Sequence, residues 1–177
     1  MFSNILVATD GSGHASNALQ VAIELANKFS AELTVTHVLT HDHPSDEMER
    51  MIEVEHMDGS HNPTIPVLTA DGTRISDGLY GRSMLRSGDK EARVIMILGE
   101  QILKRAERAA HDAGVEKVST VLLDGEYANS ILNVADTRNA DIIVMGRRGL
   151  STLKGFMTGS VSHKVSQRAK CSVLTVK

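Results

Sequence analysis

The 177-residue sequence contains no tryptophan, and aromatic residues make up only 3% of it. A core must therefore be aliphatic, built from Val, Ile, Leu and Ala. Cys171 is the single cysteine, so no disulfide can form within the chain, which favours a reducing compartment. The net charge of −3 also lacks the positive excess that attracts nucleic acid or anionic lipid. We expect no nucleic-acid partner.

Long apolar runs are missing as well. No segment approaches the roughly 20 apolar residues that span a bilayer. The N-terminus passes from Met1 directly into the apolar run 5–8, without the basic start and apolar stretch of a signal peptide. We therefore expect a cytoplasmic protein with no membrane insertion, and the length suits one domain with an elaboration.

Short apolar runs alternate with segments of helical periodicity. The runs have strand length and are rich in β-branched residues, as a parallel sheet buried on both faces requires. They cover residues 5–8, 33–39, 117–123, 141–145 and 172–176. The segments between them predict helices over 15–29, 95–113, 128–135 and 161–169, with Gly114 as a left-handed cap after the second. Residues 94–98 alone could form a strand, but the helical period continues for several turns. The alternation predicts an α/β fold: a doubly wound, five-stranded parallel sheet with helices on both faces.

Residues 42–90 interrupt this alternation. They hold all three prolines of the chain, Pro44, Pro63 and Pro66. Within them, Asp71-Gly72 lies between the apolar arms Val67-Leu68 and Ile75, a pattern typical of a β-hairpin. We interpret the stretch as an insertion between the second strand and the second helix of a single domain covering 1–177. It could act as a lid, a dimer contact or a passive loop, and part of it could be unstructured.

A glycine pattern follows the fourth predicted strand. Gly146, Gly149 and the pair Gly159-Ser160 fit the form G-x2-G-x9-G-[ST], beginning at the end of a strand and ending at the start of a helix. Glycine lets a backbone turn sharply and approach a ligand closely. A helix N-terminus offers free N–H groups and a positive dipole end, which suit a phosphate. Arg147, Arg148 and Lys154 add positive charge nearby. The alternative is an ordinary strand-to-helix loop whose glycines only make turns.

Four segments together resemble the universal stress protein family. They are residues 141–149, residues 159–162, the opening Ile5-Leu6-Val7-Ala8-Thr9-Asp10-Gly11-Ser12, and the ending 171–176. The resemblance covers nearly the whole chain apart from the insertion, and the glycine pattern is that of the family's ATP-binding branch. It implies an adenine nucleotide alpha hydrolase-like fold with strand order 3-2-1-4-5, usually dimeric, with ATP as ligand and Mg²⁺ as an optional companion of the phosphates.

The resemblance also implies the site residues. The ligand would lie where the strand order reverses, at the carboxyl ends of strands one and four. Asp10 would lie beside the nucleoside, the backbone of Val38 would contact adenine, and the glycine loop would follow the ribose and phosphates. The expected ligand-binding residues are Ala8, Thr9, Asp10, Val38, Met145, Gly146, Arg148, Gly149, Gly159, Ser160 and Val161. Asp10 before Gly-Ser could instead only cap or turn the chain.

The sequence gives weaker evidence for other kinds of binding or catalytic site. No Walker A loop is present, and Gly11-Ser12-Gly13 is only a fragment of a dinucleotide fingerprint. His37, His41, His43, His56 and His61 match no standard zinc spacing, so we interpret them as solvated loop histidines rather than metal ligands. Cys171 is expected to be a buried small hydrophobe rather than a reactive thiol. No catalytic residues are predicted.

Three functions remain open. The first is a regulatory protein whose ATP state biases dimerisation or contact with an unidentified protein partner. The second is a slow ATP-hydrolysing or nucleotidyl enzyme of the same fold. The third is a protein-binding module without nucleotide, against which the glycine pattern argues. A homodimer is expected through the last strand, 172–176, because an apolar sheet edge is normally covered or paired.

Overall fold

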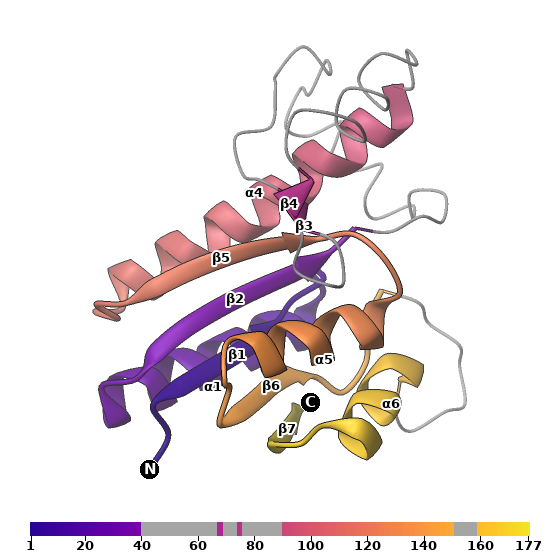
Figure 1. Cartoon of the computed structure of the whole chain (residues 1–177). Helices are drawn as coiled ribbons and strands as arrows, with labels where there is room; N and C mark the ends of the chain where they lie inside the picture. Colours follow the sequence, from indigo (N-terminus) through magenta and orange to yellow (C-terminus); the bar gives the residue numbers. More distant parts are fainter. Residues whose placement is uncertain (40–66, 69–73, 76–89, 151–158) are drawn as a thin grey trace.

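Five parallel strands form the body of one sheet in this computed structural model, which describes residues 1–39, 67–68, 74–75, 90–150 and 159–177 (Figure 1). The strands are β1 (Asn4–Ala8), β2 (Glu32–Val38), β5 (Val118–Leu123), β6 (Ile142–Gly146) and β7 (Ser172–Val176). They lie in the order β5-β2-β1-β6-β7. Counted along the chain, this is the order 3-2-1-4-5, so the predicted doubly wound sheet is confirmed.

Two further short strands extend the sheet beyond the five predicted. β3 (Val67–Leu68) runs parallel to β5, and β4 (Arg74–Ile75) pairs antiparallel with β3. Val67 lies opposite Ile75, so the arms of the predicted hairpin do pair. The Asp71-Gly72 turn itself lies outside the described residues. Part of the stretch 42–90 therefore belongs to the edge of the sheet.

The helices follow the predicted segments, with ends set by local hydrogen bonds. They are α1 (Gly13–Phe29), α4 (Lys90–Asp112), α5 (Tyr127–Thr137) and α6 (Ser160–Arg168). The Ser12 side chain caps α1 by accepting from the N–H of Ala15 at 3.3 Å. Gly114 follows α4 with a positive φ of +91°, as expected for its cap. α4 begins at Lys90 rather than at residue 95, and residues 94–98 are helical, not a strand.

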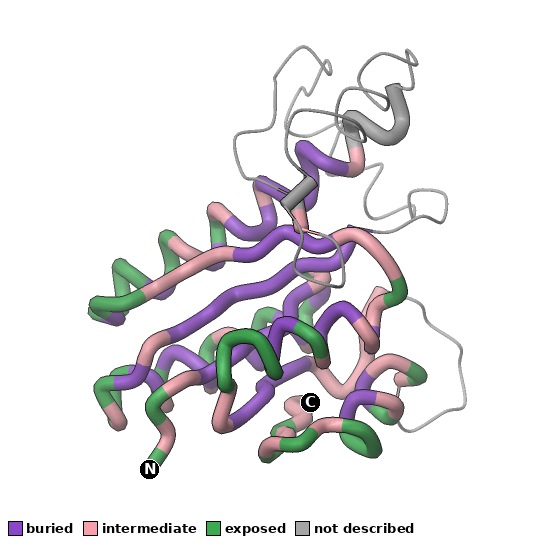
Figure 2. Tube along the Cα trace, viewed as in Figure 1, coloured by how far each residue is buried: buried purple, intermediate pink, exposed green. Residues whose placement is uncertain are grey.

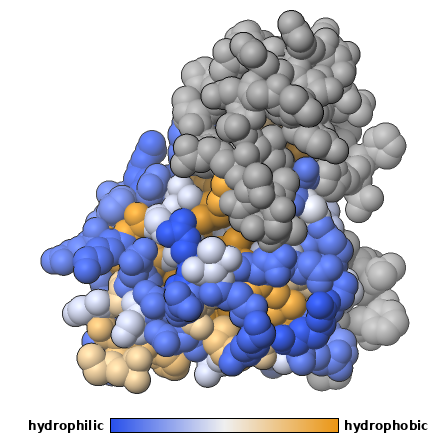
Figure 3. All heavy atoms as spheres, viewed as in Figure 1, coloured by the Kyte–Doolittle hydropathy of each residue, from blue (hydrophilic) through white to orange (hydrophobic). Residues whose placement is uncertain are grey.

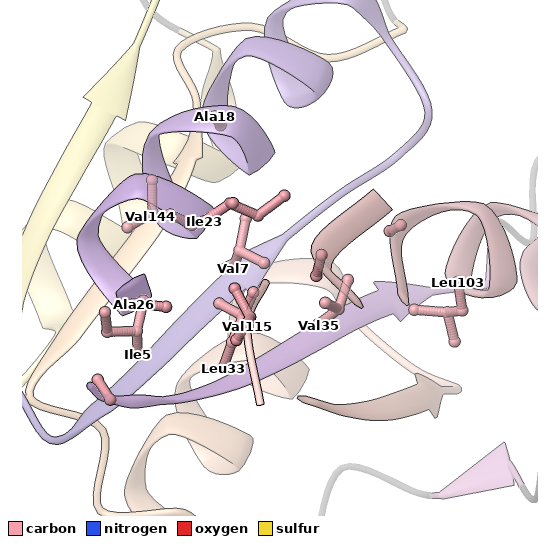
Figure 4. Packing of buried hydrophobic residues seen from close by; sticks show 14 of the residues in the cluster. Ile5, Val7, Ala18, Ile23, Ala26, Leu33, Val35, Leu103, Val115 and Val144 are labelled. Atoms are coloured by element: carbon pink, nitrogen blue, oxygen red, sulfur yellow. The ribbon is translucent and has the colours of Figure 1, made fainter. Parts of the chain in front are cut away.

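Helices cover both faces of the sheet, as the alternation predicts. α1 and α4 pack on one face, where Val7, Val35 and Leu103 belong to an aliphatic cluster (Figures 1 and 4). α5 and α6 pack on the other, against residues such as Leu6 and Ile143. β2 is buried along nearly its whole length (Figure 2). Burying an aliphatic side chain stabilises the fold by about 1.5–3 kcal/mol, so these two layers supply the main driving force.

Polar residues dominate the surface of the described part on the face that Figure 3 shows. Smaller apolar areas lie between the polar groups. Among the described residues, the large apolar side chains that are exposed are Met1 and Leu174. Within the same residues, none of the helices is both long and apolar enough to cross a membrane.

Gly99 lets α4 approach the sheet closely. A Cβ at this position would lie 2.9 Å from the side chains of both Leu122 and Leu39, and 3.0 Å from the ring of His37. These neighbours come from β5 and from β2 and its end, so α4 sits directly on the sheet at this point. A methyl group here would force these buried side chains, or the helix itself, to shift.

We predict that Gly99→Ala lowers the free energy of unfolding by about 1–3 kcal/mol, because overpacking outweighs the gain in helix propensity. Gly13→Ala is the matched control, since a Cβ on Gly13 in the first turn of α1 meets nothing within 4 Å. Urea denaturation of both variants measures the difference. Equal stability of the two variants would contradict the close approach of α4.

Candidate functional site

The carboxyl ends of β1 and β6 lie side by side at one edge of the sheet. The two strands are parallel neighbours with Ala8 opposite Met145. β2 flanks β1 on its other side, and the N–H of Thr9 donates to the carbonyl of Thr36 at 2.9 Å. The strand order therefore reverses at β1, which has β2 on one side and β6 on the other. In open α/β sheets, ligands bind at this switch point, outside the carboxyl ends of the strands.

Asp10 is held by two backbone N–H groups. Its Oδ1 accepts from Ser12 at 3.0 Å, and its Oδ2 accepts from Leu150 at 3.0 Å. Ser12 caps α1, and Leu150 belongs to the glycine loop after β6. A single carboxylate thus joins the end of β1, the start of α1 and the loop. The alternative reading of Asp10 as a turn residue is also satisfied by the bond to Ser12.

Gly146 and Gly149 are packed against the protein itself. A Cβ on Gly146 would lie 3.0 Å from the backbone N of Ala15, at the start of α1. A Cβ on Gly149 would overlap Oδ2 of Asp10. Both glycines are required for close approaches within the fold, whether or not a ligand also comes near them.

The far end of the glycine loop returns to its beginning. The N–H of Gly159 donates to the carbonyl of Arg147 at 2.9 Å, and Ser162 Oγ donates to the same carbonyl at 2.8 Å. Residues 151–158, including Lys154, lie outside the described part of the chain. Gly159 and Ser160 therefore stand next to Arg147, as the motif requires. Ser162, which sequence reasoning gave no role, is the side chain that closes the loop.

No side chain caps the N-terminus of α6 among the residues that the structure describes. Gly159 is its N-cap and brings no side-chain hydrogen bond, and first-turn N–H groups have no partner within a helix. Ser160 is exposed and Val161 is half-buried. Arg148 is half-buried nearby in sequence, and the N–H of Arg147 donates to the carbonyl of Val176 at 2.7 Å. The start of α6 and the two arginines that follow β6 thus belong to the two ends of one loop.

Val38 lies at the same edge of the sheet, at the end of β2. It pairs with Leu123 of β5, and its side chain is buried in the cluster under α5 and α6. Asp124 follows β5, and its N–H donates to the carbonyl of Leu68 at 2.9 Å. The strand-end rule that selected Asp10 also selects Asp124, but the sequence analysis did not apply it to the third strand.

His37 is buried, so its interpretation as a solvated loop histidine is wrong. It occupies β2 on the same face as Leu33 and Val35, under α1 and α4, and it is 4% exposed. The period of two along β2 could have revealed this position. Its Nδ1 lies 2.8 Å from the carbonyl of Thr9. Because a carbonyl only accepts, Nδ1 carries the proton.

Burial lowers the pKa of His37 below its ordinary value of 6.5, although the bond to Thr9 and the charge of Asp10 oppose the shift. Its Nε2 is buried and finds no hydrogen-bond partner among the described residues. Protonation would place a charge between the sheet and α4. His37 is therefore a neutral structural residue that braces the end of β1 from beneath.

The described residues were also compared with the requirements of a metal site and of a reactive thiol. In the described part of the chain, no three His, Cys, Asp or Glu side chains gather closely enough to hold a metal ion. His41, His43, His56 and His61 lie outside the described residues. Cys171 is half-buried beside the α5–α6 cluster, and burial raises the pKa of its thiol, which suits the expected small hydrophobe.

Strand order and loop define a doubly wound α/β protein with its candidate site at the β1–β6 switch point. The sequence model of the universal stress protein family matches residues 1–177. The chain belongs to the universal stress protein family. It is 35% identical over 177 residues to universal stress protein YxiE of Bacillus subtilis, covering 100% of both chains.

Solved structures of the family share the fold. One is a universal stress protein in complex with cAMP, which is 24% identical with a TM-score of 0.61 and covers 99% of this chain and 97% of its own. Another is the universal stress protein from Archaeoglobus fulgidus in complex with dAMP, which is 21% identical with a TM-score of 0.59 and covers 99% and 98%.

We predict that His37 makes the protein lose stability in mild acid. The unfolded chain binds a proton near pH 6.5, whereas folded His37 resists it, so stability is present above that pH and falls as the pH drops below it. Denaturation at about pH 7.5 and about pH 5.5 measures the loss. In His37→Asn, whose Nδ2 can still donate to Thr9, the loss should be smaller. An equal pH dependence in both proteins would contradict the assignment.

Proposed function

We propose that this protein is an ATP-binding regulatory protein of the stress response, which holds ATP at the carboxyl ends of β1 and β6. One observation carries the proposal: Asp10, the glycine loop and the N-terminus of α6 are gathered at the strand-order switch point. Such a site offers backbone donors to phosphates and needs no metal ligands of its own. The cytoplasmic location remains part of the proposal, because the single cysteine suits a reducing compartment.

The ligand class is supported from two directions. The structures solved with cAMP and dAMP show that relatives with this fold bind adenine nucleotides. This chain also carries the complete G-x2-G-x9-G-[ST] pattern, which marks the ATP-binding branch that the family resemblance implied. We therefore extend the ligand from an adenine nucleotide to ATP, with Mg²⁺ accompanying the phosphates.

The proposed contacts follow the order of the site. The backbone of Val38 lies toward adenine, and the backbone of Ala8, Thr9 and Asp10 lies beside the nucleoside. Met145, Gly146, Arg148 and Gly149 follow the ribose and the first phosphates. Gly159, Ser160 and Val161 receive the phosphate tail through first-turn N–H groups and the Ser160 hydroxyl. The dipole of α6 contributes to binding the negative charge.

Holding ATP fits the site better than cleaving it. Both carboxylate oxygens of Asp10 accept backbone N–H groups, from Ser12 and Leu150. These bonds hold the carboxylate against the chain itself, which suits a positioning role better than proton abstraction from an attacking water. A slow ATP-hydrolysing or nucleotidyl activity is the alternative, and a partner protein that reads the ATP state completes the proposed role.

We predict that ATP binds with micromolar affinity by calorimetry and that Gly159→Val weakens it at least about tenfold, which corresponds to about 1.4 kcal/mol. A Cβ at residue 159 would lie 3.2 Å from the carbonyl of Arg147, so a branched side chain disturbs the helix N-terminus. Ser166→Val, on an exposed position of the same helix, is the matched control.

The fold of both variants should be intact by circular dichroism. No measurable ATP binding by the unaltered protein would refute the proposal. Phosphate release above a few turnovers per minute, lost in Gly159→Val but kept in Ser166→Val, would instead establish the enzyme alternative.

We also propose a homodimer in which β7 pairs with its copy. β7 forms one edge of the sheet, and its Leu174 is an exposed large apolar residue (36%). An apolar edge strand invites pairing with another strand. We further propose that the chain is one domain with residues 42–90 as an insertion in it, because β3 of this stretch pairs with β5 of the main sheet.

Leu174→Lys should shift the protein from dimer to monomer in multi-angle light scattering, because a charge at the apolar edge opposes pairing. Gln167→Lys adds the same charge on an exposed face of α6 and should leave the dimer intact. A monomeric mass for the unaltered protein at working concentration would contradict the proposed dimer.

A further inference from the structure

The glycine loop is anchored at two points, Arg147 and Leu150. Arg147 is tied to the start of α6 through its carbonyl, which accepts from the N–H of Gly159 and the hydroxyl of Ser162. Leu150 is tied to the end of β1, because its N–H donates to Asp10 at 3.0 Å. The first anchor keeps a backbone bond whatever side chain stands at residue 162. The second depends entirely on the Asp10 carboxylate.

The contact of Asp10 with the loop also explains Gly149. A Cβ on Gly149 would overlap Oδ2 of Asp10, the same oxygen that accepts from Leu150. Gly149 does not have a positive φ, unlike Gly11 and Gly114. Its backbone could therefore accommodate a side chain, and the space that a side chain would need is taken by Asp10. The glycine is required for this contact rather than for a turn.

Asp10 makes charge-assisted bonds in two directions. Oδ1 holds Ser12, the cap of α1, and Oδ2 holds Leu150. Hydrogen bonds to an ionised acceptor are about twice as strong as neutral ones. The carboxylate therefore fixes the distance between the end of β1 and Leu150 in the first half of the loop. The other anchor of the loop, at Arg147, connects it to the N-terminus of α6. The adenine side of the site, at Val38, receives no bond from this arrangement.

We propose that Asp10 is a positioning residue that fixes residues 146–150 for the polyphosphate, and that Gly149 lacks a side chain to make room for its carboxylate. The role in polyphosphate binding rests on the proposed function, whereas the contact itself does not. Removing the charge frees Leu150 and shifts the loop. Binding of the phosphates then weakens, and binding of the nucleoside is largely kept.

The first test uses protein without ligand. Amide hydrogen exchange at Leu150, followed by NMR, should accelerate at least about tenfold in Asp10→Ala, because no side-chain acceptor then remains for its N–H. Asp141→Ala is the matched control. Asp141 also accepts from two backbone N–H groups, those of Ser3 and Asn4, but at the opposite edge of the sheet. Leu150 exchange should be unchanged in the control.

The second test compares two probes, ATP and adenosine. In Asp10→Asn the Kd for ATP should rise at least about tenfold, while that for adenosine changes less than about threefold. A residue that only supports the fold would not separate the two probes. Asp141→Asn should leave both dissociation constants unchanged.

The third test is a double-mutant cycle in melting temperature. Gly149→Ala should lower Tm in the unaltered protein, but hardly at all in Asp10→Ala, because the overlap is then gone. Unchanged Leu150 exchange in Asp10→Ala, or additive Tm changes, would overturn the contact. Equal weakening of ATP and adenosine in Asp10→Asn would overturn positioning and place the Asp10 carboxylate on the nucleoside. If the unaltered protein binds neither probe, the proposed function and the polyphosphate role fail together, while the exchange and Tm tests still decide the contact.

Discussion

The pairing of β1 with β2 on one side and with β6 on the other is the constraint on which the rest of the structure depends. Because all three strands are parallel, their carboxyl ends meet at one edge, and the segments that follow them must diverge there. α1 begins just after β1, and the glycine loop begins just after β6. Aliphatic side chains on both faces hold this arrangement between two layers of helices, so the site inherits the rigidity of the core.

The site itself is made chiefly of backbone. Asp10 uses both carboxylate oxygens to hold N–H groups, and the carbonyl of Arg147 collects two donors from the start of α6. Beneath the β1 end, neutral His37 supports the carbonyl of Thr9. These interactions position backbone groups at the strand ends. Such an arrangement suits a protein proposed to hold a nucleotide for recognition by a partner, since recognition requires a defined bound shape.

Much of the fold could be predicted because its signals are local. β-branched runs and helical periodicity report directly on neighbouring residues, and Asp71-Gly72 between apolar arms was enough to predict that the two arms pair, though not their register. Other features depend on contacts distant in sequence. The pairing of β3 with β5 and the close approach of α4 at Gly99 belong to this group. His37 was wrongly predicted to be a solvated loop residue because it was grouped with the nearby loop histidines. The period of two along β2 places its side chain in the core.

The sequence by itself determined the strand and helix segments, the family, and the set of residues around the glycine loop, because composition, periodicity and motif spacing are properties of the chain alone. Only the tertiary structure decided what those residues do for one another. Asp10 and Leu150 are 140 positions apart, and no local pattern records that their atoms meet. Nor does the sequence distinguish a glycine that admits a ligand from one that admits a carboxylate, since both simply lack a Cβ. That distinction arises only when parallel pairing brings the ends of β1 and β6 together.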